Sequence, residues 1–368
     1  MLMISYARLK LLALCLFWCL TSTAELPIGI YEGLLGNSGA ALSDSTAPSM
    51  YNASLLARRK VGGYSYSGST LETTTLSIDS EKSTSSTLVP GYMSSVMIGE
   101  FYNHELYVVP LLETQLNLDF VNSDASNTYS TNTILNLTSI RVGYSFAFRR
   151  FPFAFGFTAV STEQKTDSIS EANPISSDDL ISVSKTESLA KSLDVAFTFS
   201  GHHQFGGYTF GYQYLSRAWR LTESADAELT TYLPGTASTL TKSTSSVNQT
   251  PPSSLSSELR IGQGFFSNGH EFTTDTFLSE DPEKQNSYDT YQSFGYRMVS
   301  KNEHQVLVGF RQKLGVGIKH FGQASYYSCG YSWKNRGNRS VVGLYYSIDE
   351  SDNFSSSAGI TFGSEYFF

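Results

Sequence analysis

The side chains best suited to bind an anionic ligand are basic residues at alternate positions of segments with strand-like patterning. Alternate side chains point to the same face of a strand, so we expect these to share the inner face of a closed sheet. A cation there can hold a carboxylate through a charge-assisted hydrogen bond. The alternative for each is an ion pair that lines a polar lumen, with Glu113, Asp194, Glu258 or Glu365 as partner. The basic residues are Arg141, Arg217, Arg260, Arg311 and Lys313, of which we take Arg141 and Arg311 as candidate ligand contacts.

An apolar group interrupts the polar inner face of one predicted strand. Tyr107, Val109 and Leu111 would point inward, and they form the candidate pocket for an apolar ligand. Pro110 lies among them and has no N–H to give to a sheet ladder. We therefore expect a bulge or an inward kink at Pro110. The alternative is that Pro110 only begins or ends a strand at the rim of the sheet.

Other chemistry has little support in the sequence. His202 and His203 are adjacent, so on a strand they point to opposite faces, and no third metal ligand is spaced nearby. The chain has no Gly-x-Ser-x-Gly elbow, phosphate loop or dinucleotide motif. We expect neither catalytic residues, nor a metal, nor a cofactor. The net charge of −8 argues against nucleic acid as a partner.

The elements that must position these residues are strands. Apolar and polar residues alternate in 140–148, 208–214, 306–310 and 359–368, and the chain ends on Phe368. A soluble sandwich would show the same alternation, but the turns are spaced differently. Short connections near 103–104, 149–152, 201–204, 267–269, 301–303 and 335–338 alternate with longer polar segments, among them 69–91, 122–133, 164–187 and 224–254. This order is typical of a transmembrane barrel with short periplasmic turns and long external loops.

The sequence thus predicts an all-β protein, a closed antiparallel transmembrane β-barrel of about fourteen strands over residues 59–368. Residues 1–24 carry Arg8 and Lys10, an apolar run and a small-residue end, which is the order of a signal peptide cleaved after Ala24. We expect the outer membrane of a Gram-negative bacterium as location. Its lipid and the barrel-assembly machinery are the expected partners.

Residues 25–58 do not alternate and are rich in Gly, Ala and Ser. Gly39, Asp44, Tyr51 and Asn52 lie within a pattern that resembles the N-terminal hatch of the long-chain fatty acid transporter (FadL/TodX) family. The sequence departs from the family at Ala53 and Ser54, where the family's Asn-Pro-Ala is broken. The alternative is a Gly/Ala-rich lead-in with no fixed place in the barrel.

The resemblance implies a hatch inside the lumen and a fourteen-stranded barrel. It also implies an inward kink in the third strand, which is the strand of Pro110, and a lateral gap there for the ligand. The function implied is diffusion of hydrophobic small molecules, with long-chain fatty acids as the expected substrate, and not catalysis. One alternative is a structural or adhesive barrel that acts through the external segments 164–187 and 224–254. A further alternative is an outer-membrane hydrolase.

Overall fold

The computed structural model describes residues 29–78, 81–89, 91–123, 127–174, 182–234, 240–246, 256–280, 288–300, 302–314, 324–349 and 354–368. The predicted signal peptide, residues 1–24, and its cleavage site lie outside the described residues, as do residues 25–28 of the predicted hatch. Within these ranges the chain forms one antiparallel sheet and three short helical segments. None of the described helices is long and apolar enough to cross a bilayer.

The helical segments are η1 (Gly33–Leu35), α2 (Pro48–Tyr51) and η2 (Ala53–Arg58). The strands are β1 (Gly63–Ile78), β2 (Glu81–Val89), β3 (Met93–Ile98), β4 (Tyr102–Ser123), β5 (Asn127–Phe148), β6 (Phe153–Pro174), β7 (Ser182–Phe205), β8 (Tyr208–Leu215), β9 (Trp219–Pro234), β10 (Leu240–Ser246), β11 (Glu258–Ser267), β12 (His270–Glu280), β13 (Tyr288–Val299), β14 (Gln305–Leu314), β15 (Ala324–Asn335), β16 (Asn338–Asp349) and β17 (Phe354–Phe367).

The sheet closes on itself because β17 pairs with β1, from Gly63–Phe367 onward. Three barrel strands are interrupted. β2 and β3 together form the second barrel strand, because both pair with β1. β8 and β9 form one strand, because both pair with β7. β10 and β11 form the strand after it, in which β10 pairs with β9 and β11 pairs with β8. The seventeen segments are therefore fourteen barrel strands, which confirms the predicted closed antiparallel barrel and its strand number.

The outer face of the barrel is apolar, and the inner face is small or polar. On β16, Val342, Leu344 and Tyr346 are exposed, whereas Val341 and Tyr345 on the other face are buried against the lumen. The same alternation places exposed aromatic and aliphatic side chains on strand after strand around the wall. A continuous apolar belt of this extent is covered by lipid in a transmembrane barrel.

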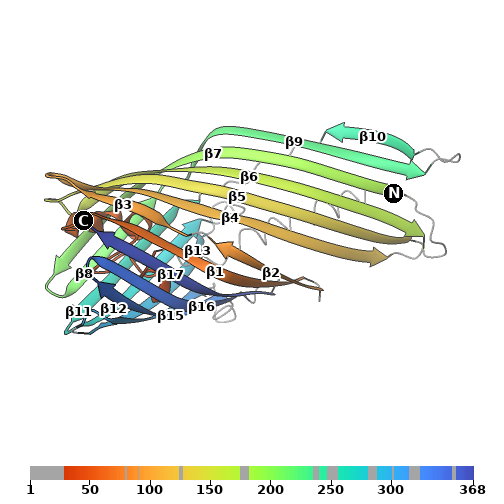
Figure 1. Ribbon diagram of the computed structural model, residues 1–368. Helices are drawn as coiled ribbons and strands as arrows, with labels where there is room; N and C mark the ends of the chain where they lie inside the picture. The colour runs from red at the N-terminus through yellow and green to blue at the C-terminus, as the bar shows by residue number, and fades with distance from the viewer. Residues whose placement is uncertain are drawn as a thin grey trace.

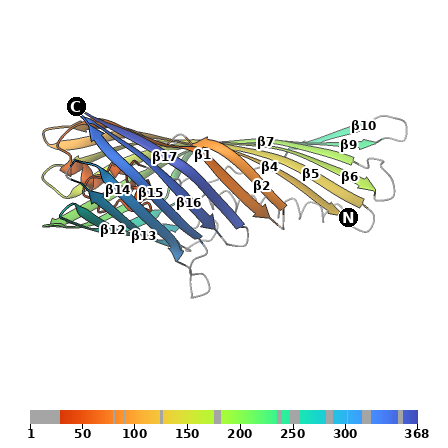
Figure 2. The same cartoon turned by 60° about the horizontal axis from the view of Figure 1, so that its bottom comes forward.

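The wall is much taller on one side than on the other. β4, β5, β6 and β7 are 22 to 24 residues long, against 10 to 14 for β14 to β17. Figure 1 shows these long strands and β9 running well past the ends of β15 to β17, and Figure 2 shows the same from a second direction.

Much of the sequence predicted as external loop is in fact strand. β1 and β2 take up most of 69–91, β4 and β5 most of 122–133, and β6, β7, β9 and β10 much of 164–187 and 224–254. The loop prediction was wrong there because Ser and Thr occupy both faces of these segments, which hides the alternation. β-branched Thr nevertheless favours a strand. Short turns lie near 149–152, 267–269, 302–303 and 335–338, as predicted. The turns predicted at 103–104 and 201–204 were wrong in position, because those residues lie in β4 and β7 and the turns fall at 99–101 and 206–207. We call the end of the barrel where these turns lie the short-turn end.

Candidate functional site

The hatch, residues 29–59, lies inside the barrel near the short-turn end, against a track of wall glycines. An added Cβ at Gly309 would lie 1.9 Å from the backbone nitrogen of Gly36, and one at Gly211 would lie 1.8 Å from the carbonyl oxygen of Ala40. At these two positions any side chain would therefore collide with the hatch backbone, which cannot shift as a flexible side chain can. The track consists of Gly211, Gly262, Gly264, Gly295, Gly309, Gly330, Gly343 and Gly363.

Wall carboxylates bind the hatch backbone directly. Asp275 Oδ2 accepts from Gly39 N at 2.8 Å and from Ala40 N at 2.9 Å. Glu105 Oε2 accepts from Ser49 N at 3.0 Å, and Glu271 Oε1 accepts from Ser43 N at 2.7 Å. All three carboxylates are buried. Because buried N–H groups need partners, these acids fix the path of the hatch through the lumen.

Each of the four predicted hatch residues makes a polar contact, three of them to the wall and one within the hatch. The backbone of Gly39 binds Asp275, and Asp44 pairs with Arg339. Tyr51 is buried, and its hydroxyl donates to Asn37 Oδ1 at 3.0 Å within the hatch. Asn52 donates from Nδ2 to the carbonyls of Ala40, 2.7 Å away, and of Gly201 on β7, 3.1 Å away.

The departure from the family pattern at Ala53 has a visible consequence. Ala53 N donates to Gln213 Oε1 of β8 at 3.0 Å, a bond that a proline at this position could not make. Asn52 Oδ1 accepts from Ser54 N at 3.1 Å and so caps η2. The broken motif therefore still begins a helical turn, with an added tie to the wall.

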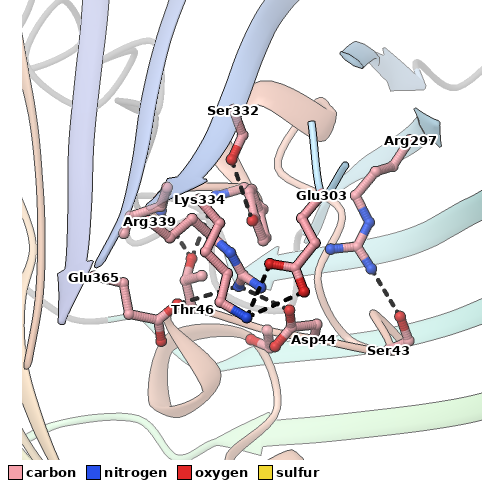
Figure 3. Close-up of polar contacts among 12 residues, drawn as sticks. Ser43, Asp44, Thr46, Arg297, Glu303, Ser332, Lys334, Arg339 and Glu365 are labelled. Carbon is pink, nitrogen blue, oxygen red and sulfur yellow. Dashed lines mark hydrogen bonds and ion pairs between the residues drawn. The ribbon is translucent and has the colours of Figure 1, made fainter. Parts of the chain in front are cut away.

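A cluster of ion pairs anchors the hatch at the short-turn end (Figure 3). Arg339 Nη1 lies 2.8 Å from Asp44 Oδ2 and 3.3 Å from Glu365 Oε2, and Arg59 Nη1 lies 2.5 Å from Glu365 Oε1. Arg297 donates to Ser43 Oγ at 2.8 Å. Burial alone would raise the pKa of Asp44, but the nearby arginines, Arg339 foremost, outweigh it and hold the pKa below its ordinary value.

The hydrogen-bond ladder between the second and third barrel strands is interrupted part of the way along, within the described residues. β3 pairs with β4 from Ile98–Asn103 to Met93–Val108, but among the described residues no ladder joins β2 to the continuation of β4. The interruption coincides with 91–92, which precede β3 and are not strand. The carbonyl of Tyr92 there accepts from Ser67 N at 2.7 Å.

Pro110 lies two residues beyond the end of the β3–β4 ladder. It pairs with Ile140 of β5, and the β4–β5 register shifts just after it, between Leu111 and Thr114. A residue without an N–H belongs at such an edge or bulge. The pairing of the third barrel strand is thus irregular next to Pro110. The side chain of Leu111 lies outside the described part of the structure.

An apolar cluster lies in the lumen beside this interruption. Tyr107 and Val109 of β4 are 3% and 2% exposed and pack with Tyr92, which is fully buried. The rings of Tyr92 and Tyr107 stack at 5.9 Å, and the Tyr107 hydroxyl shares a 2.7 Å hydrogen bond with Thr158 Oγ1. Ala47 and Tyr51 of the hatch complete the cluster. An apolar molecule that passed the interruption would meet these side chains first.

The two predicted ligand-binding arginines have different surroundings. Arg141 lies directly opposite Val109 in the β4–β5 register, next to the apolar cluster. Its Nε is buried and has no hydrogen-bond partner among the described residues. Arg311 is buried elsewhere on the wall, with its guanidinium 4.1 Å from the ring centre of Tyr291. The structure therefore does not bring Arg311 to Tyr107 and Val109, whereas Arg141 lies beside them.

Sequence reasoning missed the partners of the hatch in the wall. Alternation marks the glycines only as the small face of the strands, and it gives no partner for Asp275 or Glu271. The signal that was present is the recurrence of glycine at inward positions of successive strands. Arg260 was expected to pair with one of four other acids, but its Nη1 lies 3.6 Å from Asp275 Oδ2.

Comparison with known proteins gives matches at the level of fold. A search of family models found none that matches, and a search of curated proteins found no significant relative. Among solved structures, the CymD monoaromatic hydrocarbon channel aligns with a TM-score of 0.66 at 12% identity over 94% of this chain and 99% of that one.

Two further solved structures are similar over nearly their full length. The Ralstonia pickettii toluene transporter TbuX gives a TM-score of 0.65 at 12% identity, covering 94% of this chain and 100% of that one. A Pseudomonas aeruginosa FadL homologue gives 0.62 at 7% identity, covering 92% and 98%. These likenesses confirm the fold predicted from the hatch resemblance, a closed fourteen-stranded barrel with short helices at its N-terminus.

Proposed function

We propose that the chain is an outer-membrane channel through which hydrophobic small molecules diffuse, with the hatch closing the lumen to water. The observation that carries the proposal is the interrupted ladder between β2 and β4, with Tyr92, Tyr107 and Val109 buried directly behind it. At this interruption an apolar solute would move sideways between the lumen and the membrane. The similar solved structures named for hydrocarbons, toluene and FadL support this class of function.

Within this class we propose long-chain fatty acids as substrate. Arg141 stands beside the apolar cluster, and its buried Nε has no partner within the described residues. A carboxylate would supply the missing acceptor, while the alkyl chain would lie against Tyr107 and Val109. A neutral aromatic hydrocarbon would use the same apolar surface but would give the Nε of Arg141 no hydrogen-bond acceptor.

The test separates the channel from its substrate. A deletion strain is complemented with the wild type, with Arg141→Met or with Arg217→Met, and the uptake of oleate and of toluene is measured. Arg217 is a matched control because its side chain is 70% exposed, 3.8 Å from Glu280. We expect Arg141→Met to weaken oleate binding about tenfold or more, as the loss of one charge-assisted hydrogen bond implies, and to leave toluene entry unchanged.

Equal loss of both substrates in Arg141→Met would contradict the fatty acid assignment. Unchanged uptake of both substrates in the deletion strain would contradict the channel itself. Pro110→Val tests the lateral route, because valine restores an N–H to β4 at the interruption; we expect slower uptake with an intact hatch.

A surface-binding role is the second candidate. It is favoured by the height of β6, β7 and β9, whose described parts within 164–187 and 224–254 extend beyond the ends of β15 to β17 (Figure 1). If shortening both segments abolishes adhesion to a surface while uptake in the deletion strain is normal, this role replaces the channel.

A further inference from the structure

The outer wall of the barrel carries a groove on the side away from the interrupted ladder. It lies over β8 and β11 to β14 and has a volume of about 450 Å³. Aromatic rings form most of its lining, and Phe265, Phe272 and Phe294 are each more than half exposed. The six aromatic residues are Phe265, Phe272, Phe294, Phe310, Tyr208 and Tyr296.

The hollow follows from the sizes of side chains in adjacent rows. Tyr296 pairs with Val308, and Gln263 pairs with Thr274, which itself pairs with Phe294. The short side chain of Thr274 thus lies beside the ring of Phe294, and that of Val308 lies beside the ring of Tyr296. Because all of these residues point outward from a closed sheet, the groove opens toward the membrane and not toward the lumen.

The groove is polar at one end and along part of its floor. Tyr296, which lines it, shares a 2.7 Å hydrogen bond with His270 Nδ1, and His270 directly follows the turn at 268–269. The polar end therefore lies at the short-turn end, where the barrel meets water. Gln263 is exposed on the floor, and a bare amide facing hydrocarbon is costly unless a partner accepts its hydrogen bonds.

We propose that this groove binds one glycerophospholipid of the membrane leaflet at the short-turn end. The headgroup lies at His270 and Tyr296, the ester oxygens are within reach of polar donors such as Gln263, and the acyl chains lie against Phe294 and Phe310, which are farther from the short-turn end than Tyr296. The direction of polarity along the groove matches that of a lipid in its leaflet. This site is separate from the substrate route and does not depend on what the channel carries.

A second copy of the chain fits the groove poorly. A two-fold contact places the same patch on both sides, so a hollow would face a hollow and leave its floor unfilled. A lipid chain is flexible and fills the hollow. The lipid would also cover the wall where it is thinnest, since Gly264, Gly295 and Gly309 line the groove and contact the hatch from the other side.

The test uses the full-length barrel, delipidated in detergent and titrated with palmitoyl-oleoyl phosphatidylethanolamine, with bound lipid counted by native mass spectrometry. Val308→Trp fills the groove. Val342→Trp is the matched control, because both valines point outward and are 47% and 43% exposed, and Val342 lies outside the groove. Both variants are first checked for the heat-dependent gel shift of a folded barrel.

We expect one phospholipid that binds more tightly than the rest, weakened at least about tenfold by Val308→Trp and unchanged by Val342→Trp. Gln263→Leu should weaken it less, because the apolar lining stays. Equal binding by the two tryptophan variants would overturn the proposal. So would a wild-type dimer that Val308→Trp dissociates, since the groove would then be a contact between copies.

Discussion

Removing the carboxylate of Asp275 should release the hatch from the wall. Asp275 is fully buried, and its Oδ2 is the acceptor for the backbone N–H groups of both Gly39 and Ala40. In Asp275→Ala these two donors keep their place in the lumen but lose their acceptor. Arg260, whose Nη1 lies 3.6 Å from the same oxygen, also loses its nearest carboxylate.

The size of the effect follows from the two orphaned donors. Each buried N–H left without a partner costs about 1–3 kcal/mol, so together they weaken hatch docking by about 2–6 kcal/mol. Water entering the space left by the carboxylate moves the value toward the low end. Since about 1.4 kcal/mol is a factor of ten in an equilibrium, the undocked fraction should rise about thirtyfold or more.

The assay measures undocking through a buried thiol. Ser38→Cys is nearly isosteric and fully buried, and it is made together with Cys329→Ser, which removes the exposed cysteine. The rate of reaction with a charged maleimide then follows the undocked fraction. The control is Asp289→Ala, which removes a carboxylate 42% exposed at the surface and should change the rate little. Equal labelling rates in the two aspartate variants would refute the role given to Asp275.

Two further results are expected for the hatch. Gly309→Ala places a Cβ 1.9 Å from Gly36 N and should raise the single-channel leak to small ions. In the control Gly359→Ala, the nearest atoms to the added Cβ belong to the side chain of Tyr345, so the leak should stay low. Similar leaks in the two variants would contradict the role of Gly309 in holding the hatch. The pKa of Asp44 is held below its ordinary value, so its contribution to docking is complete above about pH 4 and is lost as the pH falls through the lowered pKa. Channel conductance should therefore rise in acid below about pH 4. Asp44→Asn should raise the leak at neutral pH and flatten the pH dependence of the conductance. If the rise in conductance in acid persists in the variant, a group other than Asp44 causes it.

The architecture of the barrel was predictable because it depends on local sequence patterns. Alternation in segments such as 140–148 defines strands, and short turns fix their order, so each strand can be counted from Phe368. The bulge or kink expected at Pro110 rests on local chemistry of the same kind, the missing N–H of proline, and stays a prediction. Local chemistry of this kind needs no knowledge of what lies across the lumen.

The hatch contacts were not predictable from such patterns. Asp275 is 236 residues from Gly39 in the chain, and nothing in either neighbourhood marks them as partners. The ion pairs show the same limit, because several inward acids and bases are compatible with a polar lumen and only the closed barrel selects Arg339 for Asp44. The heights of the strands were missed because Ser and Thr on both faces leave no alternation to read.

The track of wall glycines that the hatch packs against also imposes an order on folding. Its glycines belong to strands from β8 to β17, between residues 211 and 363, whereas the hatch precedes every strand in the chain. The segment that is synthesised first thus has no complete binding surface until the last strands have paired. Seating the hatch is then a late event, and a closed barrel with an unseated hatch is an intermediate that a slow, ordered folding pathway must pass through.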